Sequence, residues 1–480
     1  MEIRTIETKT KAIAFGDGGR LGKNKLDVLT GPNGSGKTEA LTVLVDAYAR
    51  FREVAEGDKE GVPLSAFGRL FGEATAPPSR VLAQTFSPFT RFPKPLRAGA
   101  RLLDVYERGT ERHERYICVG LHKSLRGVAG HLSRRILEEA LFRVSEFPPA
   151  TEALFSVMES LEFLPELRLV YRPKPGTQKL LSDPHQGAVY EFLSSNLESG
   201  PRFKNPLSES INEALSSRSL DEVAIAISDA LIEVRSLKDQ VKPRGLLRLD
   251  VNLQSIRREF YLLQAFSLLR RMDLLSLTQC EVTRAKDKAA FDVANASSGE
   301  QQMLCSIFGL ASAIRDEALV LIDEPELSLH PKRQIEFIDA IESLLKIVSG
   351  CHVILSTHSP VVVQAAQALG AGITQLGETH THSSMERTSK QFSVEQALVE
   401  VFDTPVSGSA HVSNQIFKAI VSAETGDAED RSLARQELEG LDRLYEGAKM
   451  SDPTPALIKD ALRLVNEAGN EDADGREIEE

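Results

Sequence analysis

The sequence predicts an α/β fold built around a parallel sheet, and three observations lead to this prediction. An apolar segment, KLDVLT, runs into the glycine-rich stretch GPNGSGKT, and a helical pattern, TEALTVLVDAYARF, follows directly. Two later segments, EALVLIDEP and CHVILSTHS, are almost uninterrupted apolar runs of the kind found in a sheet that is covered on both faces. The chain therefore begins with strand, turn and helix, and strands of a buried sheet return in its second half.

Length and composition narrow the class of protein. At 480 residues the chain is too long for one compact core, so two or three domains are expected. No window reaches the roughly 18 apolar residues of a membrane span, and the N-terminus has no apolar run of signal-peptide length, so we expect a cytoplasmic protein without membrane contact. Its four cysteines lie far apart with no CxxC pair, which excludes a disulfide framework and a zinc ribbon.

The negative charge is concentrated near the C-terminus. The net charge is -12, and residues 421–480 hold 17 Asp and Glu against 7 Lys and Arg, which leaves 52 against 50 for the rest. Such a tail suits a basic protein partner, although a solubilising tail is the commoner case. An Arg-rich stretch between Arg97 and Arg135 is interleaved with Glu residues, so a solvated face is expected there and not a nucleic-acid site.

Periodicity divides the chain into four parts. Residues 1–125 read as short strands around the glycine-rich turn, with a hairpin expected from RLLDVYERG and ERYICVGLH. Residues 126–275 read as mainly helical, with one strand-like patch at LRLVYRP. Residues 276–385 return to strand character, including TQCEVTRA, and are expected to complete the parallel sheet. Residues 386–480 read as helical, with Thr454 as the N-cap of a last helix that continues to Gly469.

The glycine-rich stretch has the spacing GxxxxGKT from Gly31 to Thr38, which binds phosphate when a strand precedes it and a helix follows. Glycines let the backbone curl around an anion, so that successive N–H groups point at phosphate oxygens. The Lys37 ammonium would contact the β- and γ-phosphates, and the Thr38 hydroxyl would bind Mg²⁺. A glycine-rich turn without a nucleotide is the weaker alternative, because both flanks fit. The residues expected to hold the nucleotide are Asn33, Gly34, Ser35, Gly36, Lys37 and Thr38.

Two carboxylate residues, Asp323 and Glu324, end the apolar run in EALVLIDEP. Asp323 can hold magnesium through water, and Glu324 can orient and deprotonate the water that attacks the γ-phosphate. An acidic pair at a strand end is modest evidence alone and strong evidence downstream of a phosphate loop. Two roles are open for the neighbouring Glu326, a supporting carboxylate or a charge at a helix N-terminus.

Three further positions complete the expected site. His358 ends the next apolar run and could report on the γ-phosphate, although a lone histidine is more often structural. Gln84, expected just after a strand in VLAQTFSP, could meet the metal ion and the attacking water. The segment NASSGEQQML opens a helix whose hydroxyl and N–H groups can form an anion site, through Ser297, Ser298 and Gly299.

This set of motifs, in this order, resembles the ABC-type ATPases over residues 1–125 and 275–365. The correspondence is Walker A at Gly31 to Thr38, a Q-loop at Gln84, a signature at Ser297 to Gln301, Walker B with Asp323 and Glu324, and a switch histidine at His358. The resemblance implies an ABC-type P-loop ATPase head that uses ATP and Mg²⁺, with a long helical insertion and a helical C-terminal extension. It also implies a dimer in which the signature of one subunit closes over ATP held by the other. The signature departs from LSGGQ, with serine for leucine and Glu300 for the second glycine.

The segments SSGEQQ and IDEPELSLHP resemble the branch that includes the RecF, SMC and OLD-type ATPases, which implies no transmembrane partner. Proline and glycine interrupt the insertion at PPATE and PKPGTQ, so it cannot form the coiled-coil arm of an SMC protein. A TOPRIM nuclease needs a DxD after a strand, and the late DxD, Asp472 to Asp474, lies in an acidic tail. His380 and His382 read as solvated residues and not as metal ligands, so no nuclease site is expected in this chain.

The overall layout and the stretch SVEQALVEVFDTP resemble the ATPase subunits of bacterial anti-phage systems, in particular Septu-type (PtuA-like) and retron-associated ones. This resemblance implies an ATPase, with slow turnover as one option, that scaffolds and gates a separate nuclease. An HNH-type partner is favoured, with DNA reached through that partner. The resemblance to the ATPase of the PARIS system, which is paired with a TOPRIM effector, leaves a second effector type open.

Two other functions compete with this hypothesis. A RecF-like DNA-repair ATPase would bind DNA directly and would show DNA-stimulated hydrolysis and an affinity that falls steeply with salt, but the weakly acidic body of the chain counts against it. A nucleotide-stabilised oligomer with negligible turnover is the third possibility, and in that case Glu324→Gln would leave activity unchanged.

Overall fold

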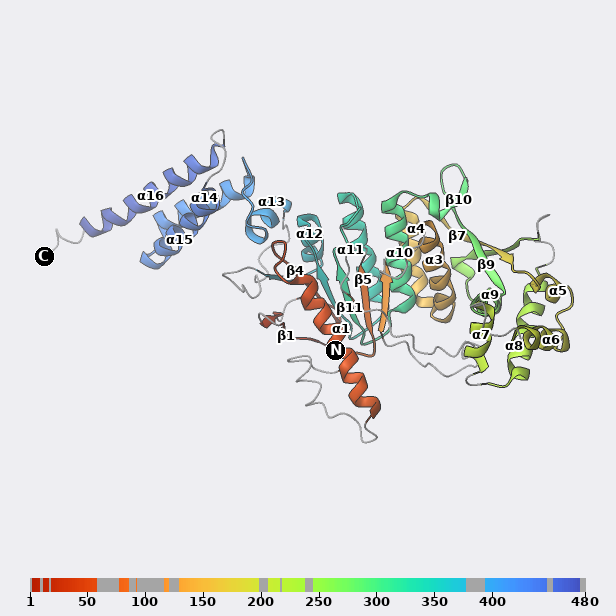
Figure 1. Cartoon of the computed structure of the whole chain (residues 1–480). Helices are drawn as coiled ribbons and strands as arrows, with labels where there is room; N and C mark the ends of the chain where they lie inside the picture. The colour runs from red at the N-terminus through yellow and green to blue at the C-terminus, as the bar shows by residue number, and fades with distance from the viewer. Residues whose placement is uncertain are drawn as a thin grey trace.

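The chain folds into three parts that follow one another along the molecule (Figure 1). A parallel sheet with helices on both faces lies in the middle, an antiparallel sheet with further helices lies on one side of it, and a helical bundle lies on the other. This arrangement comes from a computed structural model. The structure describes residues 2–8, 12–16, 19–57, 77–85, 92, 116–120, 129–197, 206–215, 218–237, 245–376, 393–446 and 452–474.

The apolar runs of the sequence form the central strands of the parallel sheet, which confirms the α/β prediction. A short strand, β3 (Arg20–Leu21), adds an antiparallel pairing to β4. All other pairings in this sheet are parallel. In spatial order the parallel strands are β13 (Gly372–Gln375), β4 (Asn24–Thr30), β12 (His352–Ser356), β11 (Leu319–Asp323), β5 (Val81–Thr85) and β6 (Tyr116–Gly120).

Alternate side chains of each central strand enter two separate cores. In β11, Leu319 and Leu321 belong to the core beneath α1 (Lys37–Gly57), whereas Val320 and Ile322 belong to the core on the other face. That second core includes side chains of α10 (Ser298–Ala313), α11 (Pro331–Lys346) and α12 (Pro360–Ala368). The sheet is therefore the middle layer of three, and α1 and α10 lie on opposite faces of it.

The first part of the chain contributes one strand to the edge of the described sheet and one separate strand pair. β6 pairs in parallel with β5. Residues 101–109, the other half of the hairpin expected from RLLDVYERG and ERYICVGLH, lie outside the described residues, so that hairpin stays a prediction. Near the N-terminus, β1 (Thr5–Glu7) pairs with β2 (Ala12–Ala14) in antiparallel.

The segment expected to be mainly helical also contributes a second sheet. This sheet is antiparallel, and TQCEVTRA lies in it and not in the parallel sheet. Its strands expose alternate residues, as in β8, where Leu247, Leu249 and Val251 are buried between exposed or half-buried neighbours. In spatial order its strands are β10 (Ala290–Asp292), β9 (Leu275–Arg284), β7 (Phe163–Pro173) and β8 (Leu247–Asn252).

The helices of this segment pack beside the second sheet and against helices that cover the face of the central sheet opposite α1. Helix α3 contacts α10 along much of its length, and α4 contacts α10, α11 and β7, so the two sheets share one continuous core. The helices are α3 (Ala129–Glu146), α4 (Thr151–Ser160), α5 (Thr177–Ser182), α6 (Gln186–Leu197), α7 (Pro206–Leu215), α8 (Leu220–Arg235) and α9 (Phe260–Arg271), with short 3-10 turns at Pro148–Ala150, Leu253–Ser255 and Val293–Asn295.

The C-terminal part is a three-helix bundle with a hydrophobic core of its own. Its last helix departs from the prediction at both ends. Asp452 accepts hydrogen bonds from the N–H and the hydroxyl of Thr454, so Asp452 caps the helix and Thr454 is its first residue. The helix also continues through Gly469. The elements are α13 (Val394–Gln396), the π-turn η6 (Ala397–Val401), α14 (Ala410–Thr425), α15 (Ala428–Leu444) and α16 (Thr454–Asp474). None of the described helices is long and apolar enough to span a membrane.

Candidate functional site

The glycine-rich loop connects β4 to α1 at the carboxyl edge of the central sheet. Gly31, Gly34 and Gly36 have φ angles of +142°, +82° and +98°, which L side chains rarely adopt. A Cβ atom on Gly31 would lie 2.2 Å from the carbonyl oxygen of Leu376. The Lys37 side chain is 5% exposed, and its ammonium donates to the carbonyl oxygens of Gly31 (2.9 Å) and Pro32 (3.0 Å). The loop therefore has the backbone conformation and the positioned cation of a phosphate cradle.

The loop is joined directly to the acidic strand end. The Thr38 hydroxyl lies 3.1 Å from both carboxylate oxygens of Asp323, and Ser356 donates to the same carboxylate. Ser356 is the parallel partner of Asp323 across β11 and β12, which is why their side chains meet. Asp323 is 3% exposed. Burial raises its pKa, the Glu324 charge adds to that effect, and the hydrogen bonds from Ser356 and Thr38 oppose it. Sequence reasoning found Thr38 and Asp323 but missed Ser356.

Glu324 and His358 face one another just beyond the ends of β11 and β12. Glu324 has a φ of +51°, and its N–H donates to the carbonyl oxygen of Ser356 (3.0 Å). This left-handed conformation redirects the side chain after the strand ends. A carboxylate oxygen of Glu324 lies 3.9 Å from Nε2 of His358. Burial lowers the pKa of His358, and the Lys37 charge lowers it further, so the imidazole is neutral at pH 7.

Glu326 supports the switch histidine through the backbone. Its carboxylate accepts a hydrogen bond from the His358 N–H at 2.6 Å. Burial raises the pKa of Glu326, and this hydrogen bond opposes the shift. Of the two roles that the sequence left open, the contact corresponds to the supporting carboxylate. One residue after His358, the Ser359 hydroxyl donates to Gln334, whose amide donates to the Leu329 carbonyl oxygen. The loop after Asp323 and the loop after Ser356 are therefore fastened together at two points.

The signature segment forms the start of α10. Ser297 is the N-cap: its Oγ accepts from the Glu300 N–H (3.3 Å), and the Glu300 carboxylate accepts from the Ser297 N–H (2.8 Å). This reciprocal capping box gives a structural reason for Glu300 at the position where the ABC-type signature has its second glycine. Ser298 is exposed, and a Cβ on Gly299 would lie 3.2 Å from the Ser328 carbonyl oxygen. Helix α10 packs on the face of the sheet opposite α1, and its first turn lies beside the loop that follows β11.

Gln84 departs from the prediction. It lies inside β5 and not after it, and in the register of the sheet it pairs with Ile322, whereas Thr85 pairs with Asp323. Paired residues of parallel strands point to the same face, so Gln84 and Asp323 point to opposite faces. Gln84 is 1% exposed, and its Oε1 has no hydrogen-bond partner among the described residues. The structure does not bring Gln84 to the group formed by Thr38, Asp323 and Glu324.

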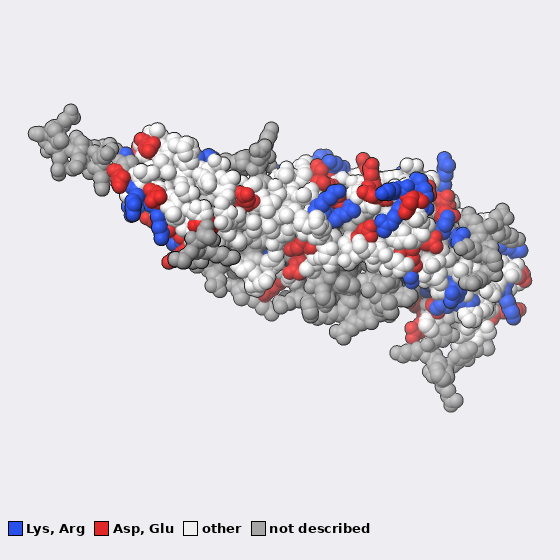
Figure 2. Space-filling model, turned by 90° about the horizontal axis from the view of Figure 1, so that it is seen from above, with Lys and Arg blue, Asp and Glu red and all other residues white. Residues whose placement is uncertain are grey.

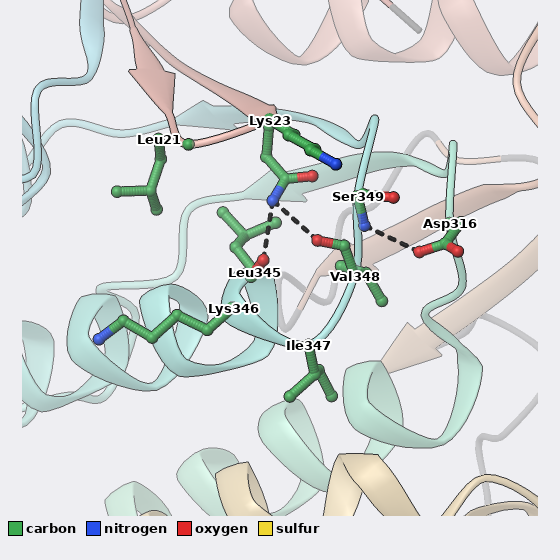
Figure 3. Close-up of a pocket in the computed structure, with 10 residues that line it drawn as sticks. Leu21, Lys23, Asp316, Leu345, Lys346, Ile347, Val348 and Ser349 are labelled. Atoms are coloured by element: carbon green, nitrogen blue, oxygen red, sulfur yellow. Dashed lines mark hydrogen bonds between the residues drawn. The ribbon is translucent and has the colours of Figure 1, made fainter.

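A separate pocket of about 570 Å³ lies at the other edge of the sheet, where β4 and β12 begin (Figure 3). Its polar groups hold the chain together: the Asn24 amide donates to the carbonyl oxygens of Leu345 and Val348, and Asp316 accepts from the Ser349 N–H. Lys23 and Lys346 lie at its mouth, and both are exposed. The hydrogen bonds of Asn24 hold the end of α11 against the sheet at this pocket. None of the residues that line the pocket belongs to the phosphate loop.

The donor set at the carboxyl edge fits ATP and Mg²⁺. A backbone cradle with a lysine suits phosphate, and a threonine hydroxyl beside an aspartate carboxylate offers the oxygen ligands that Mg²⁺ takes. The Thr38 hydroxyl and the Asp323 carboxylate are within hydrogen-bonding distance of one another. The pairing of β11 with β12 holds Asp323 in place.

Comparison with known proteins agrees with this geometry. Residues 171–364 match the family described as "AAA domain, putative AbiEii toxin, Type IV TA system". A segment of 68 residues is 41% identical to Protein ea59 of Escherichia phage lambda. That segment is 14% of this chain and spans 13% of the length of ea59. The matched residues include Ser297 to Gln301, Asp323, Glu324 and His358 but not the phosphate loop, and the match supports a P-loop ATPase at the level of the superfamily.

Proposed function

We propose that this P-loop ATPase is the ATP-binding and ATP-hydrolysing subunit of a bacterial anti-phage defence complex, in which it scaffolds and gates a separate nuclease. The observation that carries the proposal is the direct chain of contacts from the phosphate loop to the C-terminal bundle. The description of the matched family names a putative toxin of a type IV toxin–antitoxin system, and the proposal places this chain in a related setting.

At the site, each residue has a role that its position supports. ATP with Mg²⁺, when bound, supplies the reactive γ-phosphate and the charge neutralisation that phosphoryl transfer needs. The Lys37 ammonium and the N–H groups of the loop from Asn33 to Thr38 would hold the phosphates. Thr38 and Asp323 would hold the metal ion, directly or through water. Glu324 would accept a proton from the attacking water, and the His358 imidazole, 3.9 Å from the Glu324 carboxylate, would face the same water.

The path to the bundle begins at His358. The next residue, Ser359, is the N-cap of α12, and its hydroxyl accepts from the Val362 N–H. Helix α12 packs against η6, whose Ala397 and Val401 lie in the core of the ATPase part, whereas Val399 lies in the core of the bundle. A change at His358 would therefore reach the bundle through two packed elements, which is the kind of rigid connection that a gate needs.

A second copy of the chain would complete the nucleotide site. Ser298 is exposed at the start of α10, on the face of the sheet opposite α1. A helix N-terminus favours an anion, and because Ser298 is exposed it is open to a phosphate held by a second copy. ATP-bridged dimers, or a larger assembly of dimers, are therefore part of the proposal.

The test uses the full chain, expressed alone and together with the protein encoded beside it. ATP hydrolysis, native mass with and without ATP, and plasmid cleavage are measured for the wild type and for Glu324→Gln. The proposal expects cleavage only from the two-protein complex, loss of hydrolysis in Glu324→Gln, and a change in cleavage when hydrolysis is lost. If DNA stimulates ATP hydrolysis by the chain alone, a RecF-like DNA-binding ATPase is favoured. Equal behaviour of the wild type and Glu324→Gln would favour a nucleotide-stabilised oligomer.

A further inference from the structure

Large apolar side chains are exposed on two helices of the C-terminal bundle. Phe417 is 67% exposed and Val421 39% exposed on α14, and Leu457 and Leu464 are 49% and 48% exposed on α16. Isolated exposed apolar residues are normal on a protein surface, whereas a contiguous patch marks a binding site. These residues therefore indicate a binding site only if they are neighbours on the surface.

Helices α14 and α16 start side by side and run in the same direction. The Asp452 carboxylate, just before α16, hydrogen-bonds to Ser407 and to the Gly408 backbone, just before α14. With a rise of about 1.5 Å per residue, Phe417 lies at a height between those of Leu457 and Leu464, and Val421 lies level with Leu464. The four side chains therefore span the same stretch of the bundle.

The helical phases place three of these side chains on the flanks that face each other. On α14, the side bearing His411 and Lys418 faces α15, because their charges act on Glu437 of α15. Phe417 and the half-buried Ile420 lie on the other flank, toward α16, whereas Val421 lies almost opposite the buried face of α14. The two helices run in parallel and face one core, so the flank of α16 that meets α14 lies on the opposite side of its buried face and carries Leu457 and Leu464. Phe417, Leu457 and Leu464 therefore line the seam between α14 and α16, which we call the groove.

Acidic residues surround this groove. On α16, Asp460 and Glu467 alternate with Leu457 and Leu464 along one stripe, and Glu424 follows Phe417 and Ile420 on α14. Over the described residues 410–446 and 452–474 the bundle holds 14 Asp and Glu against 6 Lys and Arg. Figure 2 shows this end of the molecule, at the left, as a mainly white surface with red and blue groups at its margins.

We infer that the groove between α14 and α16 binds one basic amphipathic helix of the partner subunit. Its apolar side chains would cover Phe417, Leu457 and Leu464, and its Lys or Arg residues would meet the acidic rim. The groove from Leu457 to Glu467 is about 15 Å long, which suits about three turns of helix. The inference rests on the proposed function, because it names where the gated subunit is held.

The first experiment uses defined peptides and the full chain. A labelled peptide of about 15 residues places Leu at helical spacing i, i+3, i+4, i+7 and Lys elsewhere, and a matched peptide has Glu in place of Lys. We expect the Lys peptide to bind, and Phe417→Ala and Leu464→Ala each to weaken binding by about tenfold. Leu433→Ala is the matched control, since Leu433 is 58% exposed on α15, outside the groove. Equal binding of the Glu peptide, or equal loss in Leu433→Ala, overturns the inference.

The second experiment separates the inference from the proposed function. The chain is co-expressed with the protein encoded beside it, and the complex is measured by native mass for the wild type and for the Phe417→Ala, Leu464→Ala double variant. Thermal unfolding of each chain alone confirms that the bundle is folded. If the wild type forms no complex, the proposed function fails while the peptide result stands. If the double variant keeps the complex at unchanged affinity, the docking site is wrong while the proposed function stands.

Discussion

Replacing Glu326 by alanine tests whether the loop after Asp323 positions the switch histidine. The variant removes the carboxylate that accepts the His358 N–H at 2.6 Å. A hydrogen bond to a charged acceptor contributes about 1.5–3 kcal/mol, which corresponds to roughly 10- to 150-fold if it is needed only in the transition state. We therefore expect kcat for ATP hydrolysis to fall by at least about tenfold, while KM for ATP changes little.

The controls separate positioning from general destabilisation. Glu326→Gln keeps an acceptor oxygen and should restore most of kcat. Glu342→Ala removes a carboxylate whose pairing is with the exposed Lys346, four residues along α11, and should leave kcat within about twofold. Steady-state hydrolysis and thermal unfolding are measured for all variants. A normal kcat in Glu326→Ala, or a loss that follows the unfolding temperature and not the acceptor atom, refutes the positioning role.

Three further predictions follow from other parts of the molecule. Gly31→Ala forces a Cβ to within 2.2 Å of the Leu376 carbonyl oxygen and should abolish ATP binding, measured by calorimetry. Leu438→Ala, in the core of the bundle, should lower the free energy of unfolding by about 2–5 kcal/mol in a denaturant titration. Burial raises the pKa of Glu138 to about 7, so the folded state binds its proton more tightly than the unfolded state. The stability from Glu138 should therefore be present below pH 4.5 and decline by about 3 kcal/mol as the pH rises past 7, and Glu138→Gln should remove that slope.

Much of the ATP site could be predicted because its signals are local in the sequence. The phosphate loop needs glycines at positive φ next to a strand and a helix, and all three features lie within one short stretch around Lys37. Asp323 is the last residue of β11 and Glu324 follows it. The uninterrupted apolar run of this strand indicates a position in the middle of the sheet. Ser356 carried no such signal, since its contact with Asp323 depends on which strand lies beside β11.

The second sheet was missed for a related reason. β7 pairs with β8 and β9, and these pairings join segments that are separated by several helices. The alternation of Leu247, Leu249 and Val251 in β8 was a usable signal for a half-buried strand. Gln84 was misplaced by a single residue in the strand boundary, and in a strand one residue is enough to exchange the two faces.

The order of strands in the central sheet has a consequence for how the chain folds during translation. β4, which leads into the phosphate loop, lies between β12 and β13, and its buried Asp27 contacts His352, 325 residues later in the chain. At a translation rate of about 5–20 residues per second, the ribosome needs roughly 15–65 s to deliver these neighbours. During that time β4 has only the short strand β3 as a partner in the sheet, and its apolar residues are open to chaperones. The first parallel strand to be made is thus among the last to be enclosed.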